Sequence, residues 1–340
     1  MDGKTYQFYA MSVAGLEDLA LDDMQRRLGP LQQVHTERGK AYGRIFFTHR
    51  RSPLKLLELP CIHDVFALVG QIYNVAGGRE GLRRIVEQVE KWDLQPARRL
   101  VEVCGGPGGN RFELAASVQG QHRFKRRDLD LAVGEALVRH HGLAPGSGPQ
   151  ALRLQVQVTG RRAFFGVRLP ARRPQTTGGR PPLISGALAY CLGCLLGIEA
   201  EDTGLVLEGA GDLEQYWPAR QVIYGGPRAI AQVANWIRCR PGNLPLDGTS
   251  LDWIMGDGRP QVGPYWQELL TESARVLVPG GVALIVGPAP PVGGRVVEEG
   301  SWPLGVIAEI PIYLEGRPRS ILMLERWPEE ELLTIEMGSG

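Results

Sequence analysis

The sequence predicts two halves of different build, an α+β N-terminal half and an α/β C-terminal half with a Rossmann-type sheet. In residues 251–286, an apolar strand leads into a short polar turn and an amphipathic helix over 265–276. A Val-Pro-Gly-Gly turn then opens the next apolar strand, which is the order of a βαβ unit. The strands and helices of the N-terminal half do not follow this βαβ order. Residues 171–182 are rich in Pro, Gly and Arg, which predicts a linker between the halves.

The first segment reads strand, helix, strand, helix. Residues 6–10 alternate as a strand does, and residues 15–27 place Leu16, Leu19, Ala20 and Met24 on one helical face. Residues 42–48 are strand-like and residues 53–59 are helical in pattern. This succession predicts a small α+β domain of the ferredoxin-like kind over residues 1–75.

A second α+β domain is predicted over residues 76–170. The glycine cluster at 105–110 is a connection, because no Gly-Lys-Ser/Thr follows it and a strand comes next instead of a helix. The pattern then predicts strands over 112–117, 152–158 and 163–169, with a helix over 129–140.

The C-terminal half, residues 183–330, is expected to begin with a buried helix. Residues 183–198 are uncharged but fall short of the roughly 18 residues that a membrane span requires. Predicted strands lie near 203–207, 221–224 and 251–256, with a helix over 228–236 after the second, and a further strand is expected close to residues 237–241. A hairpin of two strands, 305–311 and 319–324, is predicted to close the sheet.

The two halves of the chain carry net charges of opposite sign. Residues 1–182 hold 28 Lys and Arg against 17 Asp and Glu, a net charge of +11. Residues 183–340 hold 10 against 20, a net charge of −10. A basic half joined to an acidic half predicts a polyanion partner, RNA above all, for residues 1–182 and leaves a protein partner open for the acidic half. The plain alternative is that solvated charges merely segregate by domain.

The most concentrated basic motif is His122-Arg123-Phe124-Lys125-Arg126-Arg127. Its cations would neutralise phosphates, while Phe124 would either stack on an unpaired base or lie in the core, which we favour. Asp128 is expected to cap the next helix. The predicted RNA-binding residues are spread over four segments: Arg111, His122, Arg123, Lys125, Arg126, Arg127, Arg172 and Arg173. Arg161 and Arg162 are candidates for the same surface.

Other classes are disfavoured. The N-terminus has no long apolar run, so we expect neither a secretory leader nor a membrane anchor. Five cysteines form no disulfide framework, and the pair Cys191 and Cys194 lacks the further ligands of a zinc site. We therefore expect buried cysteines, no metal, and a reduced cytoplasmic protein.

The segments YQFYAMSVAGLEDLALDDM and RFELAASVQGQHRFKRRDLDLAVGEAL resemble THUMP-domain RNA methyltransferases. Across the whole chain the layout is similar to that of the tRNA guanine-N2 methyltransferases. This resemblance implies a ferredoxin-like domain, a THUMP domain that grips the acceptor stem and 3′ end of tRNA, and a contracted class I methyltransferase domain that uses S-adenosylmethionine.

The family's cofactor motifs are altered here. Glu208, Gly209 and Gly211 stand at the expected glycine-rich turn, which is shortened. The ribose-binding acid after the second strand is replaced by Gly-Gly-Pro at 225–227, and Ile-Arg-Cys-Arg-Pro at 237–241 stands where the adenine-binding Asp is expected.

The family's reactive turn is altered too. Of that Asp-Pro-Pro-aromatic turn, Asp257 and Pro260 remain, with Gly258, Arg259 and Gln261 at its other positions. Tyr265 could supply the aromatic group if the loop folds back. We expect these residues to be vestigial, no cofactor, and an RNA-binding protein. The alternatives are an active methyltransferase with a diverged cofactor site, or a fold that has lost RNA binding as well.

Overall fold

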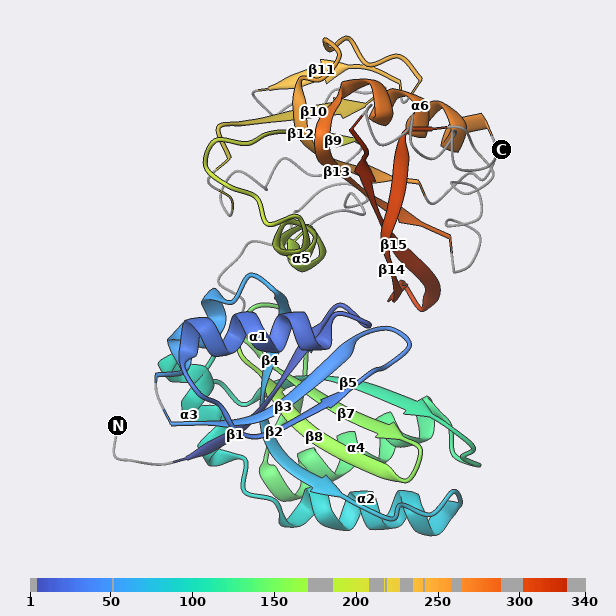
Figure 1. Cartoon of the computed structure of the whole chain (residues 1–340). Helices are drawn as coiled ribbons and strands as arrows, with labels where there is room; N and C mark the ends of the chain where they lie inside the picture. The colour runs from blue at the N-terminus through green and yellow to red at the C-terminus, as the bar shows by residue number, and fades with distance from the viewer. Residues whose placement is uncertain are drawn as a thin grey trace. The chain divides into compact units, whose positions relative to one another are not determined.

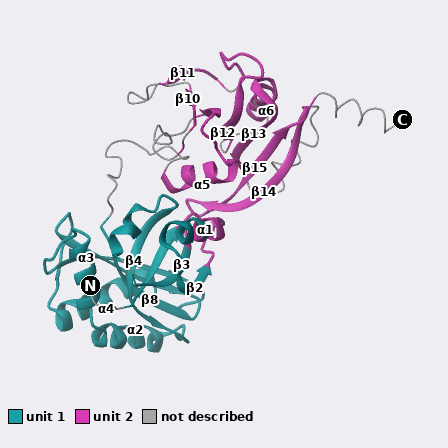
Figure 2. Cartoon of the chain, turned by 60° about the vertical axis from the view of Figure 1, so that its left-hand side comes forward, with its two compact units in different colours: residues 1–11, 22–36, 44–175 teal, residues 12–21, 37–43, 176–340 magenta. Residues whose placement is uncertain are grey.

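The computed structural model describes residues 5–50, 52–170, 186–207, 217, 219–226, 235–240, 242–258, 264–288 and 302–328. The chain forms two compact units (Figure 2). The first unit comprises Met1–Met11, Asp22–Thr36 and Arg44–Gln175, and the second comprises Ser12–Leu21, Glu37–Gly43 and Thr176–Gly340.

An eight-stranded sheet organises the N-terminal half (Figure 1). Its order is β2-β3-β1-β4-β8-β7-β5-β6. The strands are β1 Tyr6–Ser12, β2 Gln32–Glu37, β3 Gly43–His49, β4 Ile62–Ile72, β5 Arg111–Gln119, β6 Ala144–Pro145, β7 Ala151–Thr159 and β8 Arg162–Arg168. Strands on both sides of residue 75 share this one sheet, because β4 pairs with β8.

The helices of this half are α1 Glu17–Leu28, the 3-10 helix η1 Pro53–Glu58, α2 Arg79–Lys91, α3 Gln95–Val103 and α4 Arg126–His141. The predicted strands and helices are confirmed, except that 53–59 forms a 3-10 helix. Helix α1 buries Leu16 at its entry, then Ala20, Met24 and Leu28, which is one face at helical spacing. Helices α2 and α4 pack against each other, and α4 packs on β5 (Figure 1).

A seven-stranded sheet in the order β11-β10-β9-β12-β13-β15-β14 organises the C-terminal half. Its strands are β9 Thr203–Leu207, β10 Gln221–Gly226, β11 Trp236–Arg238, β12 Leu251–Asp257, β13 Leu277–Gly287, β14 Leu304–Leu314 and β15 Arg317–Arg326. Strands β9 to β13 run parallel, while β15 is antiparallel to both of its neighbours. A Rossmann-like sheet in a mixed α/β chain is therefore confirmed.

Two helices accompany this sheet, α5 Gly186–Leu196 and α6 Pro264–Val276. The predicted helix over 228–236 lies almost wholly outside the described residues, and Trp236 opens a strand. The closing hairpin is confirmed: Glu315 and Gly316 have φ of 52° and 75°, as a two-residue hairpin turn requires. Helix α5 is buried as predicted, and no helix among the described residues is long and apolar enough to cross a membrane.

Candidate functional site

Three connections of the first unit meet at one end of its sheet. Arg123 donates its backbone N–H to Gly77 O at 2.6 Å, which joins the β5–α4 connection to the β4–α2 connection. Val75 N donates to Arg161 O at 2.8 Å, and this joins the β4–α2 connection to the β7–β8 turn. Gly160 N donates to Gln119 O at 2.9 Å, which joins the β7–β8 turn to the end of β5. Segments that are distant in sequence thus form one continuous surface.

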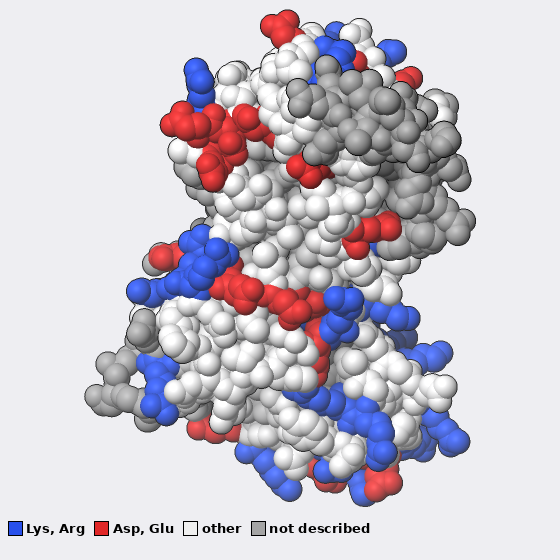
Figure 3. All heavy atoms as spheres, in the orientation of Figure 1, with Lys and Arg blue, Asp and Glu red and all other residues white. Residues whose placement is uncertain are grey.

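Exposed cations cover this surface. We call it the basic loop surface, and it consists of Arg79, Arg84, Arg123, Lys125, Arg126, Arg127 and Arg161, all of which are exposed. Arg84 reaches back to donate to Asn74 O at 3.4 Å. Figure 3 shows groups of Lys and Arg over the lower part of the molecule, where Figure 1 places α2 in the same orientation.

Two helix N-termini lie at the same place. Helix α2 begins at Arg79 and α4 begins at Arg126, directly after the joined connections. The helices run side by side in the same direction, because His141 near the end of α4 hydrogen-bonds Val89 O near the end of α2 at 2.8 Å. The positive ends of both helix dipoles therefore add to the charge of the side chains and favour an anion.

The structure separates some of the predicted RNA-binding residues from others. Arg123, Lys125, Arg126 and Arg127 lie together in the basic loop surface. Arg111 begins β5, whereas the cluster follows its end, and a nine-residue strand spans roughly 26 Å between them. Arg172 and Arg173 lie outside the described residues.

His122 and Phe124 support the loop from inside. Phe124 is 5% exposed, so the core interpretation is confirmed. The His122 ring packs against it at a centroid distance of 4.9 Å and hydrogen-bonds Gly160 O at 2.7 Å. Asp128 accepts from Lys125 N at 2.7 Å from the third helical position, so it caps the helix from within the first turn.

Sequence reasoning missed Arg79 and Arg84. Gly77-Gly78 precedes them and opens an amphipathic helix, yet Gly78 offers no side-chain cap, so the usual start signal was absent. The hydrogen bond between Gly77 and Arg123, which only the fold brings about, joins these arginines to the predicted cluster.

The second candidate site lies where strand order reverses in the second sheet. The chain leaves β9 towards β10 and β11, then returns to β12 on the other side of β9. Ligands of such sheets bind at this switch point, beyond the carboxyl ends of the strands. Leu207 pairs with Gly256, so Asp257 lies one residue beyond the end of β9. Asp257 is 8% exposed.

Aromatic side chains of α6 hold the turn that follows Asp257. Tyr265 donates its hydroxyl to Asp257 O at 3.1 Å, which brings this aromatic side chain to the end of β12. Trp266, 1% exposed, donates its indole N–H to Gly258 O at 2.7 Å. Gly258 N in turn donates to Val286 O at 2.9 Å. Asp257 and Gly258 are thus held by α6 on one side and by β13 on the other, and Pro260 lies outside the described residues.

The described strand ends do not fit the usual contacts of a nucleoside cofactor. Near the end of β10, a Cβ on Gly225 would lie 2.6 Å from Cys239 Sγ and 3.1 Å from Leu207 Cδ2, so a carboxylate side chain there would have to displace both side chains. Arg238 ends β11 with an exposed guanidinium. Of the residues described at the ends of β9 to β12, Asp257 is the sole carboxylate. Glu208, Gly209 and Gly211 lie outside the described residues.

A polar clasp ties the β11–β12 connection to α6. Glu272 Oε2 accepts from Leu244 N at 2.8 Å, and Arg275 donates to Leu244 O at 2.9 Å and to Leu246 O at 2.8 Å. The two side chains also bond each other, with Arg275 Nη2 2.8 Å from Glu272 Oε2. The hydrogen bond from Arg275 lowers the pKa of Glu272, and the same bond raises the pKa of Arg275.

Comparison with known proteins finds similarity to methyltransferases. No family model matches it. It is 28% identical over 214 residues to the tRNA (guanine(6)-N2)-methyltransferase of Thermus thermophilus, a match that covers 52% of this chain and 62% of that relative. The chain thus matches less than two thirds of the relative's length.

Solved structures share the fold along nearly the whole chain. TrmN from Thermus thermophilus superposes with a TM-score of 0.69 at 19% identity, covering 95% of this chain and 100% of that one. SMU.472, described as a methyltransferase and complexed with SAH, gives 0.65 at 10% identity, covering 94% and 98%. The predicted resemblance to THUMP-type tRNA methyltransferases is confirmed, and the fold is that of methyltransferase structures.

Proposed function

We propose that this relative of the tRNA (guanine-N2) methyltransferases binds tRNA through its first unit and does not use S-adenosylmethionine in the manner of its family. The ferredoxin-like domain over residues 1–75 and the THUMP domain over 76–170 are part of this proposal. The observation that carries it is the convergence of three connections and two helix N-termini on the basic loop surface.

Phosphates are the ligands that this surface suits. Its seven cations are exposed and mounted on a backbone that is fixed by hydrogen bonds, so little ordering is needed on binding. Contacts of this kind position a nucleic acid without reading its sequence, and their strength falls as salt rises. The similarity to a tRNA methyltransferase supports tRNA as the nucleic acid.

Charge reversal tests the RNA-binding part. Unmodified tRNA transcripts are titrated with the full chain between 50 and 200 mM salt. Lys125→Glu should weaken binding at least tenfold and reduce the slope of log affinity against log salt by about 1. Lys55→Glu is the matched control, because Lys55 is also exposed but lies in η1, outside the basic loop surface. Equal affinities for the two variants would refute the assignment.

The proposal that the chain does not use S-adenosylmethionine in the manner of its family rests on the residues at the end of β10. Glycine at 225 supplies no acid to accept hydrogen bonds from the ribose, and the Cys239 and Leu207 side chains crowd the place where one would stand. Calorimetric titration with S-adenosylmethionine and S-adenosylhomocysteine tests it directly. We expect no binding heat up to millimolar ligand, whereas micromolar affinity would overturn this part and leave the RNA part standing.

The second candidate is an active tRNA methyltransferase. It is favoured by the hydrogen bond from Tyr265 to Asp257 O, which brings an aromatic residue to the predicted reactive turn. In that case the Asp257 carboxylate would accept a hydrogen bond from an exocyclic amine and Tyr265 would pack on the base. Methyl transfer from labelled S-adenosylmethionine to tRNA, abolished by Asp257→Ala, would establish this function.

A further inference from the structure

A small hollow opens on the sheet of the first unit, beside the basic loop surface. Residues of β1, β2, β3, β4 and β8 line it together with Tyr73, which follows β4, and none of the lining residues belongs to a helix. Its cavity volume is about 240 Å³. Pockets that enclose a whole drug-sized ligand hold about 300–1,000 Å³, so this hollow suits a single group of a longer molecule.

An arginine packs against two aromatic rings in this hollow. Arg162 Cζ lies 4.3 Å from the centre of the Phe46 ring and 5.5 Å from the centre of the Tyr73 ring. Gln71 Oε1 accepts from Arg162 Nη2 at 2.6 Å and from the Tyr73 hydroxyl at 2.9 Å, which holds both side chains in place. Phe46 is buried, whereas Tyr73 is 60% exposed. The guanidinium and the Tyr73 ring are therefore flat groups on which a nucleobase can stack.

The other polar side chains of the lining can each donate and accept hydrogen bonds. Gln7, Gln33 and His35 are exposed, and Thr48 donates its hydroxyl to Gln33 Oε1 at 2.9 Å. Amide and imidazole groups of this kind match the mixed donors and acceptors along the edge of a base. Among the described residues that line the hollow, none is acidic. The lining therefore suits a ligand that carries negative charge elsewhere.

The hollow borders directly on the basic loop surface. Arg162 follows Arg161 of that surface, and Val75, two residues beyond Tyr73, donates its backbone N–H to Arg161 O at 2.8 Å. A phosphate bound at Arg161 would therefore bring the base of an adjoining nucleotide to the hollow. A base inside a duplex presents neither its face nor its pairing edge, so an unpaired nucleotide is required.

We propose that the hollow binds the base of an unpaired nucleotide in the RNA whose phosphates lie on the basic loop surface. The base stacks on the Arg162 guanidinium and the Tyr73 ring, and the amides of Gln7 and Gln71 bond its edge. This inference rests on the proposed RNA binding and adds to it a site for a single-stranded nucleotide. Because Tyr73 carries no charge, its contribution to affinity does not depend on salt.

A short single-stranded RNA of mixed sequence, and a duplex of the same sequence and length, are titrated with the full chain. Tyr73→Ala should weaken binding of the single strand about 5-fold to 100-fold, because it removes one stacked base. The slope of log affinity against log salt and the affinity for the duplex should not change. Tyr73→Phe keeps the ring and should retain most of the affinity. Tyr42→Ala is the matched control, since Tyr42 is 42% exposed and lies between β2 and β3, outside the hollow.

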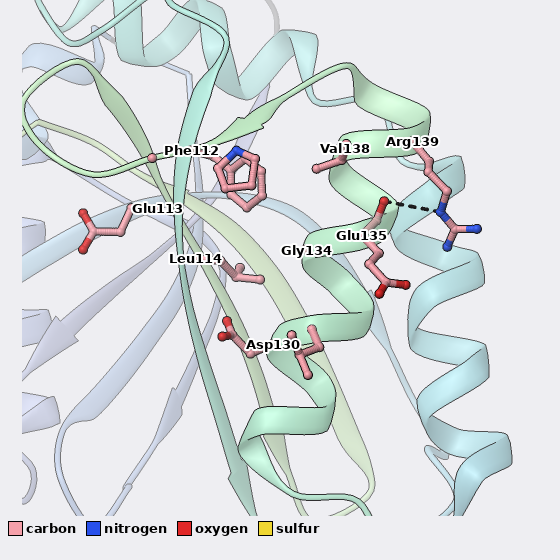
Figure 4. Close-up of a pocket in the computed structure, with 11 residues that line it drawn as sticks. Phe112, Glu113, Leu114, Asp130, Gly134, Glu135, Val138 and Arg139 are labelled. Carbon is pink, nitrogen blue, oxygen red and sulfur yellow. Dashed lines mark hydrogen bonds between the residues drawn. The ribbon is translucent and has the colours of Figure 1, made fainter.

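Photo-crosslinking locates the base. Single-stranded RNA that carries 5-iodouridine should crosslink to Tyr73, as identified by mass spectrometry. The contrasting site is the groove between α4 and β5, where Leu114, Leu131 and Val138 form an apolar lining (Figure 4). Crosslinks in that groove with none at the hollow would overturn the inference.

Failure of this inference is distinguishable from failure of the proposed RNA binding. If Lys125→Glu weakens binding and Tyr73→Ala does not, the hollow is excluded as a base site while the RNA-binding proposal stands. If neither variant changes affinity, both proposals fail. An equal loss of single-strand and duplex affinity in Tyr73→Ala would also exclude a site for unpaired bases.

Discussion

Gly258 offers the sharpest test of how the turn after β12 is built. A Cβ at this position would lie 2.7 Å from Trp266 Cζ2 and 2.9 Å from Ile285 Cγ2. Optimal carbon contacts are about 3.5–4.0 Å, so both neighbours would have to move by roughly 0.6–1 Å. Trp266 is 1% exposed and Ile285 is fully buried, so neither can move into solvent. Overpacking of this kind costs about 1–3 kcal/mol.

Gly256 supplies the matched control in the same strand. Its Cβ would meet Leu269 Cδ2 at 3.6 Å, an ordinary contact. Gly256→Ala should therefore be neutral or more stable by about 0.4–1 kcal/mol, because it lowers the entropy of the unfolded chain. Thermal unfolding followed by tryptophan fluorescence should show Gly258→Ala melting about 2–12 °C below wild type. Equal melting temperatures for the two variants would refute the packing that ties Gly258 to Trp266.

Three further changes test other contacts. Trp266→Phe removes the indole donor and leaves Gly258 O buried without it, so urea unfolding should show a loss of about 1–3 kcal/mol. Glu272→Gln should lower the melting temperature most above about pH 5. The lowered pKa of Glu272 contributes stability that is present above its unfolded pKa and is lost as pH falls through its folded pKa. Melting curves of this variant and wild type should therefore converge towards pH 3, and a constant gap would contradict the clasp. Gly134→Ala should raise the free energy of unfolding by about 0.5–1 kcal/mol, and a loss would show that the chain needs the glycine itself.

The second sheet was predictable because its signals are local. Apolar strands ending at short turns, the amphipathic pattern of 265–276 and the Glu-Gly turn of the closing hairpin can each be read within one segment. Helix α2 is amphipathic, but Gly78 at its N-cap makes no side-chain hydrogen bond, so α2 lacks a Ser, Thr, Asp or Asn start. Helix α3 has a start signal that the sequence reasoning did not use: Asp93 accepts from Gln95 N at 2.9 Å, and a proline stands in the first turn.

The candidate site was only half predictable, because its remaining residues meet through backbone contacts. The run from Arg123 to Arg127 is visible in sequence, but Arg79 joins it through a hydrogen bond between residues 77 and 123. Proximity in sequence can also suggest a shared surface that the fold does not form. Arg111 is near the run along the chain but lies at the far end of an extended strand. Charge composition predicts a basic half, whereas topology decides which cations share a surface.

The proposed RNA-binding surface and the expected cofactor site lie in different compact units, so we expect substitutions to affect the two independently. The basic loop surface is formed by connections of the first sheet, and its geometry depends on hydrogen bonds such as Arg123 N to Gly77 O. The cofactor site would depend on the strand ends of the second sheet, where Gly225 is closed against Cys239. Changes at that closed strand end leave the hydrogen bonds of the basic loop surface intact. A change at the expected cofactor site therefore requires no compensating change in the basic loop surface. For this reason tRNA affinity and cofactor affinity have to be measured separately.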